Sequence, residues 1–390
     1  MIENGIKYSY NDIMIKPAVV SNISHRDMCD PFKVFCKLPI FTAPMSSVVC
    51  EENFNLFEKN FITPILPRNF SLDKRIEYLR NYKWVALSLS EFNQLFNEND
   101  WDFETYDTVH VLIDIANGHM NDLCKAVSNA ISKYPNQPNF KIMVGNIANP
   151  KTYRKLAFCG VHYIRIGIGG GNGCITSSCT GVHYPMASLI EETYKVKQEI
   201  LNAYINDPQL DHTPDRFEVD EYENSLPKIV ADGGVRGNDD IIKAYALGAD
   251  YVMVGSVFAQ LIESAAETTT PEYKIINPFK DEIIKQPNGS FKVTGVGLFS
   301  KLYKRFYGMA SRQGQIDISG EKTHTSEGCE KILSCTTTIH KWVENFISNM
   351  RTAMSYTNCY HVNDFNPMNV TTIIISEQAK QSINKSITPT

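Results

Sequence analysis

Residues 228–256 read KIVADGGVRGNDDIIKAYALGADYVMVGS, and this stretch contains one complete repeat of the pattern that decides the fold. It begins with a short apolar run at 228–232, which leads into two glycines. A helix-like segment follows at 238–247, and a second apolar run at 250–255 closes the stretch. Apolar, β-branched runs separated by helix-length segments are typical of β/α units around a parallel sheet.

The same alternation recurs along the chain before this stretch. We predict eight strands, at residues 40–45, 61–66, 84–89, 109–115, 140–146, 162–168, 228–232 and 250–255. We predict helices between most of them, for example at 51–60, 72–80, 121–133, 150–158 and 238–247. Eight such units indicate an α/β fold of the (β/α)8, or TIM barrel, class. An open, doubly wound sheet is the alternative.

Two segments interrupt the regular spacing of the units. Residues 202–225 are acidic and polar, and residues 268–300 carry three prolines together with Asn288-Gly289, for which we predict a hairpin turn. We therefore predict one barrel domain over residues 1–375, with excursions near 202–225 and 268–300. A loose polar tail is predicted over 376–390.

The composition is that of an ordinary globular protein. The 390 residues include 38 basic and 43 acidic side chains, for a formal charge of -5, and 43% are hydrophobic. This excludes disorder as the main state, and the acidic balance speaks against nucleic-acid binding through overall charge. No apolar stretch reaches the ~18 residues that span a bilayer, and residues 1–11 lack a signal pattern. We expect a cytoplasmic protein with no membrane or nucleic-acid partner.

The ten cysteines are scattered from Cys29 to Cys359, and no C-x-x-C pair occurs. This pattern indicates reduced thiols and gives no support to a structural zinc site.

The loop after the sixth predicted strand is unusually rich in glycine, since residues 167–176 read GIGGGNGCIT. Catalytic groups of a (β/α)8 barrel lie on loops at the C-terminal ends of its strands. Cys174 is therefore a candidate nucleophile, and the loop could also wrap a ligand or present carbonyls to a monovalent cation. Asp232-Gly233-Gly234 and Gly255-Ser256, after the next two strands, could bind phosphate through backbone amides. The alternative is that these glycines only form tight turns between a strand and a helix.

Ten short motifs, in order from about residue 8 to residue 357, resemble the inosine monophosphate (IMP) dehydrogenase and guanosine monophosphate (GMP) reductase family. They are Asn11-Asp12-Ile13-Met14-Ile15-Lys16-Pro17, Ala43-Pro44-Met45, Asp114-Ile115-Ala116-Asn117-Gly118, Gly145-Asn146, Gly173-Cys174-Ile175-Thr176, Ala231-Asp232-Gly233-Gly234, Val254-Gly255-Ser256, Tyr307-Gly308-Met309, Ser326-Glu327-Gly328 and Met350-Arg351. Each motif alone is weak, but their joint order is highly specific.

The resemblance implies a barrel that assembles as a homotetramer and binds a purine nucleoside monophosphate. Cys174 would be the nucleophile that attacks purine C2, and Thr176 and Glu327 would manage the proton on the leaving nitrogen. Potassium would bind at Gly169, Gly171 and the Cys174 carbonyl. The substrate-binding positions would be Asp232 at the ribose, Gly234, Gly255, Ser256 and Tyr307 at the phosphate, Gly308 and Met309 along the base, and Gly233 beside them.

The implied cofactor is NADPH for a reductase, or NAD for a dehydrogenase. No G-x-G-x-x-G opens a helix behind a strand, so a Rossmann domain does not carry it. The cofactor-binding positions implied by the resemblance are Arg68, Asp114, Ile115, Ala116, Thr352, Ala353, Met354 and Ser355.

The resemblance is closer to GMP reductase in the flap region. Dehydrogenases carry an Arg-Tyr pair on a mobile flap, where the arginine activates water, but the corresponding interval here, 312–326, contains no such pair. The interval 89–110 also leaves no room for the regulatory cystathionine-synthase-type (CBS) domain pair of many dehydrogenases.

Other positions depart from the reductase pattern. Ala43-Pro44-Met45 and the motif around Asp232 look more like the dehydrogenase. Ser46, Asn172 and Ser177 differ from both subfamilies, and Asn172 stands where a phosphate-binding serine is usual. We predict an NADPH-dependent GMP reductase. The alternatives are an IMP dehydrogenase without CBS domains and a catalytically silent barrel that binds purine nucleotides.

Overall fold

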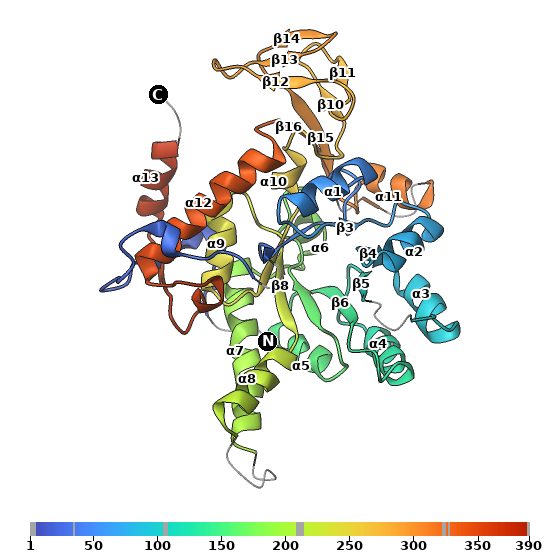
Figure 1. Cartoon of the computed structure of the whole chain (residues 1–390), viewed down its shortest axis with the longest axis vertical. Helices are drawn as coiled ribbons and strands as arrows, with labels where there is room; N and C mark the ends of the chain where they lie inside the picture. Colours follow the sequence, from blue (N-terminus) through green and yellow to red (C-terminus); the bar gives the residue numbers. More distant parts are fainter. Residues whose placement is uncertain are drawn as a thin grey trace.

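The computed structural model describes residues 5–33, 36–103, 108–207, 214–321, 325–326 and 328–387. Its centre is a sheet of eight parallel strands in the order β2-β9-β8-β7-β6-β5-β4-β3 (Figure 1). The strands are β2 (Ile40–Thr42), β3 (Ile65–Leu66), β4 (Trp84–Leu87), β5 (Val109–Asp114), β6 (Phe140–Ile147), β7 (Tyr163–Ile166), β8 (Lys228–Asp232) and β9 (Tyr251–Val254). All eight predicted strands are confirmed.

The sheet curls into a barrel because its first and last strands meet. β2 pairs in parallel with β9 through Ile40 and Val252, and Phe41 of β2 forms an isolated parallel bridge with Thr63, just before β3. The (β/α)8 prediction is therefore confirmed, and the alternative of an open sheet is wrong.

The barrel interior is filled by side chains from alternate strand positions, as the two-residue period of a strand requires. Phe41 and Trp84 meet edge to face with ring centroids 5.5 Å apart, and aliphatic residues fill the remaining space. The buried interior cluster comprises Phe41, Ala43, Ile65, Trp84, Ala86, Leu112, Met143, Val230 and Met253. The barrel is thus a packed core, and chemistry is confined to the loops at its ends.

Helices cover the outside of the barrel (Figure 1). Local signals fix their starts: α5 begins after Asn149, whose side chain accepts a bond from the Lys151 amide, and Pro150 takes its first position. The main covering helices are α1 (Glu51–Lys59), α2 (Leu72–Arg80), α4 (Asn121–Lys133), α5 (Pro150–Ala157), α7 (Met186–Ile205), α9 (Asn238–Ala246) and α12 (Ile339–Thr357). Short helices at or near the loops are α3 (Leu89–Phe92), α6 (Thr176–Thr180), α8 (Arg216–Ser225), α10 (Ser256–Ala259) and α11 (Arg312–Ser319).

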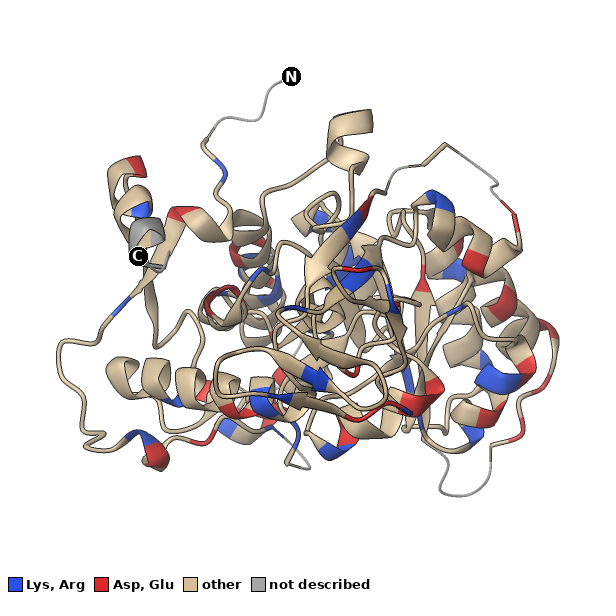
Figure 2. Cartoon of the chain, turned by 90° about the horizontal axis from the view of Figure 1, so that it is seen from above, with Lys and Arg blue, Asp and Glu red and all other residues tan. Residues whose placement is uncertain are grey.

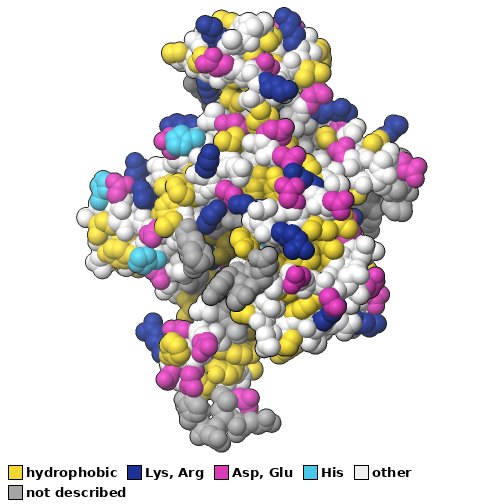
Figure 3. Space-filling view, turned by 45° about the vertical axis from the view of Figure 1, so that its right-hand side comes forward, with side chains coloured by type: hydrophobic (Ala, Val, Ile, Leu, Met, Phe, Trp, Pro, Cys, Tyr) yellow, Lys and Arg dark blue, Asp and Glu magenta, His cyan; other side chains and the backbone are white. Residues whose placement is uncertain are grey.

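The second excursion supplies β10 to β14 of two small antiparallel sheets, which stand as a knob at the top of the view (Figure 3). The predicted hairpin is confirmed, because β12 pairs with β13 and Gly289 has φ +82° between them. One sheet contains β12 (Ile283–Lys285), β13 (Phe291–Val293) and β14 (Gly297–Phe299). The other contains β10 (Thr268–Thr269), β11 (Ile275–Ile276), β15 (Tyr303–Tyr307) and β16 (Glu330–Ser334).

The segments near the chain ends are more ordered than the sequence indicates. β1 (Ile13–Lys16) pairs antiparallel with β17 (Thr371–Ile374), and α13 (Glu377–Ile387) follows. Within the predicted tail over 376–390, residues 377–387 form α13, where Lys380 forms an ion pair with Asp12. Within the other predicted excursion, the chain first completes α7 and later forms α8, whose Tyr222 stacks on Tyr204 at 3.9 Å.

Basic and acidic side chains are interspersed around the barrel helices (Figure 2). Among the residues that the structure describes, no helix combines the length and the apolar character that a bilayer crossing requires.

Candidate active site

Two glycine loops meet at the C-terminal end of the barrel. The first follows β7 and the second follows β8. A Cβ atom at Gly167 would lie 2.0 Å from the carbonyl oxygen of Asp232, and Gly167 has φ +133°. A Cβ at Gly170 would lie 3.6 Å from the Gly234 amide nitrogen. At Gly167 only glycine allows this approach, which brings the predicted cysteine loop against the predicted ribose and phosphate loop.

Cys174 lies half-buried on the first loop and has a hydroxyl partner. Its Sγ donates a hydrogen bond to Oγ1 of Thr176 at 3.2 Å, and Thr176 opens α6. The structure thus brings together the predicted nucleophile and one of its predicted proton-handling partners.

The cysteine loop is also held by a distant segment of the chain. Cys174 forms an antiparallel bridge with Gly328, and the Cys329 amide donates to the Gly173 carbonyl at 2.9 Å. Ser326 Oγ donates to the Gly328 carbonyl at 2.7 Å. Glu327, the third predicted catalytic residue, lies outside the described residues, but its neighbours flank the Cys174 loop.

Asp232 is part of a buried charge network that sequence reasoning missed. Arg165 of β7 donates to Asp232 Oδ2 from Nε at 3.2 Å and from Nη2 at 2.8 Å, and its Nη1 donates to Asp114 Oδ1 at 2.6 Å. Asn146 Nδ2 donates to the same Asp232 oxygen at 2.8 Å. Burial opposes the charge of Arg165, but the two carboxylates outweigh it and raise the pKa of the guanidinium. The signal available was an arginine inside the strand Tyr163–Ile166, which is otherwise apolar.

This network joins two predicted sets, since Asp232 belongs to the substrate set and Asp114 to the cofactor set. The bonds that Asp232 accepts from Arg165 and Asn146 all go to its Oδ2, and the described residues leave Oδ1 of Asp232 without a partner. One carboxylate oxygen therefore fixes the side chain while the other can accept hydroxyl donors.

Gly308 and Gly255 occupy close-packed positions at the same C-terminal end of the barrel, its mouth. A Cβ at Gly308 would lie 2.9 Å from the Gly173 carbonyl oxygen, and one at Gly255 would lie 3.2 Å from the Met45 sulfur. Ser256, buried, begins α10. Met309 follows Gly308 in the turn before α11, so the predicted base-contact positions adjoin the Cys174 loop.

Tyr307, which is predicted to hold the phosphate, contacts a carboxylate through its hydroxyl. Its hydroxyl donates to Asp317 Oδ2 at 2.8 Å, and Ser46 Oγ donates to the same oxygen at 2.7 Å. Burial and the Asp317 carboxylate raise the pKa of Tyr307 to about 12. The hydroxyl thus faces an anion, which works against a phosphate at that atom.

The predicted potassium positions offer the right donor type. The Gly169 carbonyl accepts a bond from Ser177 Oγ at 3.3 Å, and the Gly171 carbonyl accepts one from the Cys174 amide at 3.0 Å. A carbonyl oxygen has a second lone pair, so both still fit a monovalent cation. No group of three His, Cys, Asp or Glu side chains suited to a metal occurs within the described ranges.

The predicted cofactor positions fall into two groups. Arg68 Nη1 donates to the Asp114 carbonyl at 3.3 Å, and Arg68 Nε is buried without a partner among the described residues. An orphaned donor beside Asp114, Ile115 and Ala116 fits a polar group of a dinucleotide.

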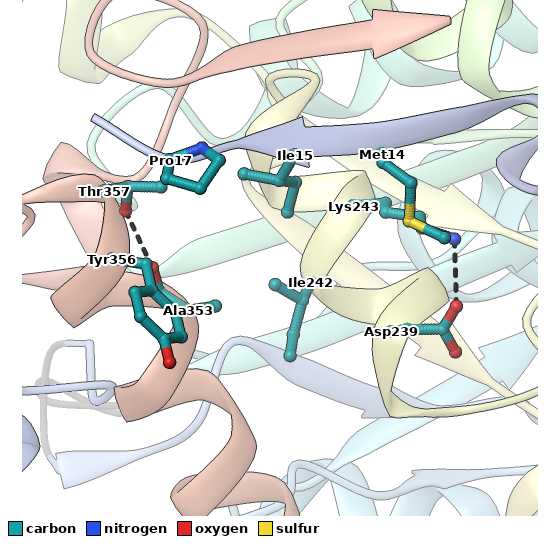
Figure 4. A pocket seen from close by; sticks show the side chains of 9 residues that line it. All are labelled: Met14, Ile15, Pro17, Asp239, Ile242, Lys243, Ala353, Tyr356 and Thr357. Carbon is teal, nitrogen blue, oxygen red and sulfur yellow. Dashed lines mark hydrogen bonds and ion pairs between the residues drawn. The ribbon is translucent and has the colours of Figure 1, made fainter. Parts of the chain in front are cut away.

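Thr352, Ala353, Met354 and Ser355 instead lie on α12. Ala353 lines a cavity of about 260 Å³ between β1, α9 and α12 (Figure 4). Met354 is fully buried, and the Thr352 hydroxyl is bonded to the Ser348 carbonyl. Neither Arg68 nor residues 114–116 line this cavity, so it is separate from the first group.

Comparison with known proteins adds an independent finding. A family model described as "IMP dehydrogenase / GMP reductase domain" matches residues 103–384. The chain belongs to the IMP dehydrogenase / GMP reductase family. The prediction that the chain is an oxidoreductase is confirmed.

Relatives within the IMP dehydrogenase / GMP reductase family include proteins named GMP reductase. The one from Bacillus anthracis is 28% identical over 285 residues, which are 70% of this chain and 77% of the relative. The one from Clostridium acetobutylicum is 29% identical over 283 residues, covering 70% and 76%. The one from Onchocerca volvulus is 21% identical over 374 residues, covering 91% and 88%.

Proposed function

We propose that this chain is an NADPH-dependent GMP reductase, which converts GMP to IMP and ammonia. The observation that carries the proposal is the Cys174 thiol paired with the Thr176 hydroxyl on a glycine loop at the barrel mouth. The relatives named GMP reductase support the same reading.

In this mechanism the Cys174 sulfur adds to purine C2 of GMP. The C2–N bond then breaks, and the 2-amino group leaves as ammonia after taking up a proton, which we assign to Thr176 and Glu327. NADPH supplies the hydride that C2 accepts. The C2–sulfur bond then breaks, which releases IMP and returns the thiolate. The net reaction consumes GMP, NADPH and protons, and yields IMP, NADP and ammonium.

The remaining residues orient the nucleotide. Asp232 Oδ1 would accept the ribose hydroxyls, because Oδ2 is fixed by Arg165 and Asn146. Gly233, Gly234, Gly255 and Ser256 would hold the phosphate through backbone and hydroxyl donors, and Gly308 and Met309 would lie along the base. Potassium bound by the carbonyls of Gly169, Gly171 and Cys174 would stiffen the loop that carries the nucleophile.

The interval 312–326, which follows Gly308 and Met309, favours the reductase over the dehydrogenase. The interval 312–326 lacks the Arg-Tyr pair that would activate water, and the structure forms α11 from its first eight residues. Without an activated water the covalent adduct is not hydrolysed. Hydride transfer to C2 is then the step that leads to release of the nucleotide.

The cofactor and the assembly belong to the same proposal. Arg68 and Asp114, Ile115 and Ala116 would contact the cofactor near the mouth. Thr352, Ala353, Met354 and Ser355 would belong to α12 of a neighbouring copy in a homotetramer, since Ala353 lines a cavity that Arg68 and residues 114–116 of its own chain do not reach.

The test is turnover of the purified chain with each nucleotide. GMP with NADPH should lose NADPH absorbance and yield equal amounts of IMP and ammonia. Cys174→Ser should lower the rate by about a thousandfold or more. Cys179→Ser, an exposed cysteine on the adjoining helix, should leave it close to that of the unchanged chain.

Two results would overturn the proposal. Formation of xanthosine monophosphate from IMP and NAD would establish the dehydrogenase. Nucleotide binding with no turnover in either direction would establish the silent barrel.

A further inference from the structure

Lys331 contacts the catalytic loop directly and has no role in the proposal above. It lies on β16, opposite Phe306 of β15. Its Nζ donates to the Asn172 backbone carbonyl at 2.6 Å and to Asn172 Oδ1 at 2.8 Å. An ammonium group has three donors, so one N–H remains for a ligand.

The loop that Lys331 contacts through Asn172 lies against the proposed phosphate loop. Asn172 follows Gly171, whose amide nitrogen would lie 3.3 Å from a Cβ at Gly233. On the other side, a Cβ at Gly173 would lie 2.9 Å from the Phe306 ring and 3.1 Å from the Gly308 amide nitrogen. Lys331 thus joins the loop to the strand pair that carries Tyr307 and Gly308.

The charge balance of the mouth calls for a cation there. A phosphate monoester carries about two negative charges at neutral pH. The guanidinium of Arg165 is already neutralised by Asp114 and Asp232, and Asp317 adds a negative charge at Tyr307. Gly234, Gly255 and Ser256 contribute neutral donors only.

We propose that Lys331 is the cation that binds the phosphate of the nucleotide, with Asn172 holding its ammonium in place. This inference rests on the proposed function. Asn172 stands where the family usually has a phosphate-binding serine, so a lysine held by asparagine replaces a neutral hydroxyl with a positive charge at the same edge of the loop. Because a charge-assisted bond is stronger than a neutral one, the exchange would favour nucleotides over nucleosides.

The experiment compares binding of GMP and IMP with binding of guanosine and inosine, in the absence of NADPH. Lys331→Met should weaken GMP and IMP binding roughly tenfold to a hundredfold. Guanosine and inosine should bind as they do to the unchanged chain. Lys331→Arg, which keeps the charge, should restore most of the GMP affinity. Lys292→Met, at an exposed position of the outer sheet, is the matched control and should change nothing.

Asn172→Ala separates phosphate binding from a purely structural tether. If Lys331 only holds the loop, Asn172→Ala and Lys331→Met should weaken nucleotides and nucleosides alike, which would overturn the inference. If Lys331 binds phosphate, Asn172→Ala should keep most of the preference for GMP over guanosine.

The two proposals fail in different ways. A chain that binds GMP through Lys331 but does not reduce it would end the proposed function and keep this inference. A chain that reduces GMP while Lys331→Met binds it normally, or an unchanged chain that binds GMP no better than guanosine, would end this inference.

Discussion

The guanidinium of Arg165 joins Asp232, proposed to bind the ribose, to Asp114, proposed to contact the cofactor. Removing it would leave two partly buried carboxylates near each other without a counter-charge. Arg165→Met should therefore lower the free energy of unfolding by roughly 3 to 5 kcal/mol, measured by urea denaturation. Arg165→Lys should recover only part of the loss, because an ammonium cannot form the same fork of bonds.

The control for Arg165 is Arg305, which pairs with Glu330 on the surface. Arg305→Met should cost less than about 1 kcal/mol. Equal losses in the two variants would mean that the buried network does not stabilise the mouth.

Among the helices, strands and turns, those that a local sequence pattern encodes could be predicted. α2 occupies the predicted residues 72–80, and the hairpin at Asn288-Gly289 forms because Asn-Gly is itself a turn signal. The contact of Ser46 with Asp317 spans 271 positions and depends on the folded chain alone. The helix at 377–387 was missed because its composition is polar, and its ion pair with Asp12 spans 368 positions.

In the candidate site, too, local motifs could be predicted and contacts between distant residues could not. Cys174, Thr176 and the glycine loops could be predicted because each belongs to a continuous motif that matches the family. Arg165 and Lys331 could not, since their partners come from other strands and loops. The engagement of Tyr307 by Asp317 was missed for the same reason.

The contact between the two glycine loops gives an element-scale prediction. Gly167→Ala would add a Cβ 2.0 Å from the Asp232 carbonyl oxygen at a residue with φ +133°, so the β7 and β8 loops would have to separate. The free energy of unfolding should fall by roughly 3 kcal/mol or more, and GMP binding should be lost.

Gly181→Ala is the matched control for Gly167→Ala. Gly181 also has a positive φ, +72°, but a Cβ there would meet nothing within 4 Å. It should cost only the backbone strain of about 1 to 2 kcal/mol, measured by urea denaturation. An equally mild effect at Gly167 would show that the loops tolerate separation.

At the scale of the whole molecule, two histidines make the barrel sensitive to acid. Burial lowers the pKa of His110 and of His162 to about 4. The Ile142 amide donates to His162 Nδ1 at 3.3 Å, which requires that nitrogen to be unprotonated. The unfolded chain protonates these residues near pH 6.5, so between pH 6.5 and 4 it binds more protons than the folded chain, and stability falls as the pH falls.

Urea denaturation at pH 7 and pH 5 measures this loss, which should be at most about 2 kcal/mol for each histidine. The variant His110→Gln/His162→Gln should show a shallower dependence on pH in the same interval. An unchanged dependence would assign the acid sensitivity to other groups.

The ribbon formed by β15 and β16 connects the mouth to the outer sheets, and this connection has a mechanical consequence. At one end Gly308 and Gly328 touch the Cys174 loop, and at the other Leu302 and Cys335 are buried in the small outer core. Because β15 and β16 are hydrogen-bonded along their length, we expect a displacement of the outer sheets to move the Gly308 and Gly328 segments together. A load on the outer sheets would then reach the Cys174 loop through the bridge between Cys174 and Gly328, although the two are far apart along the chain.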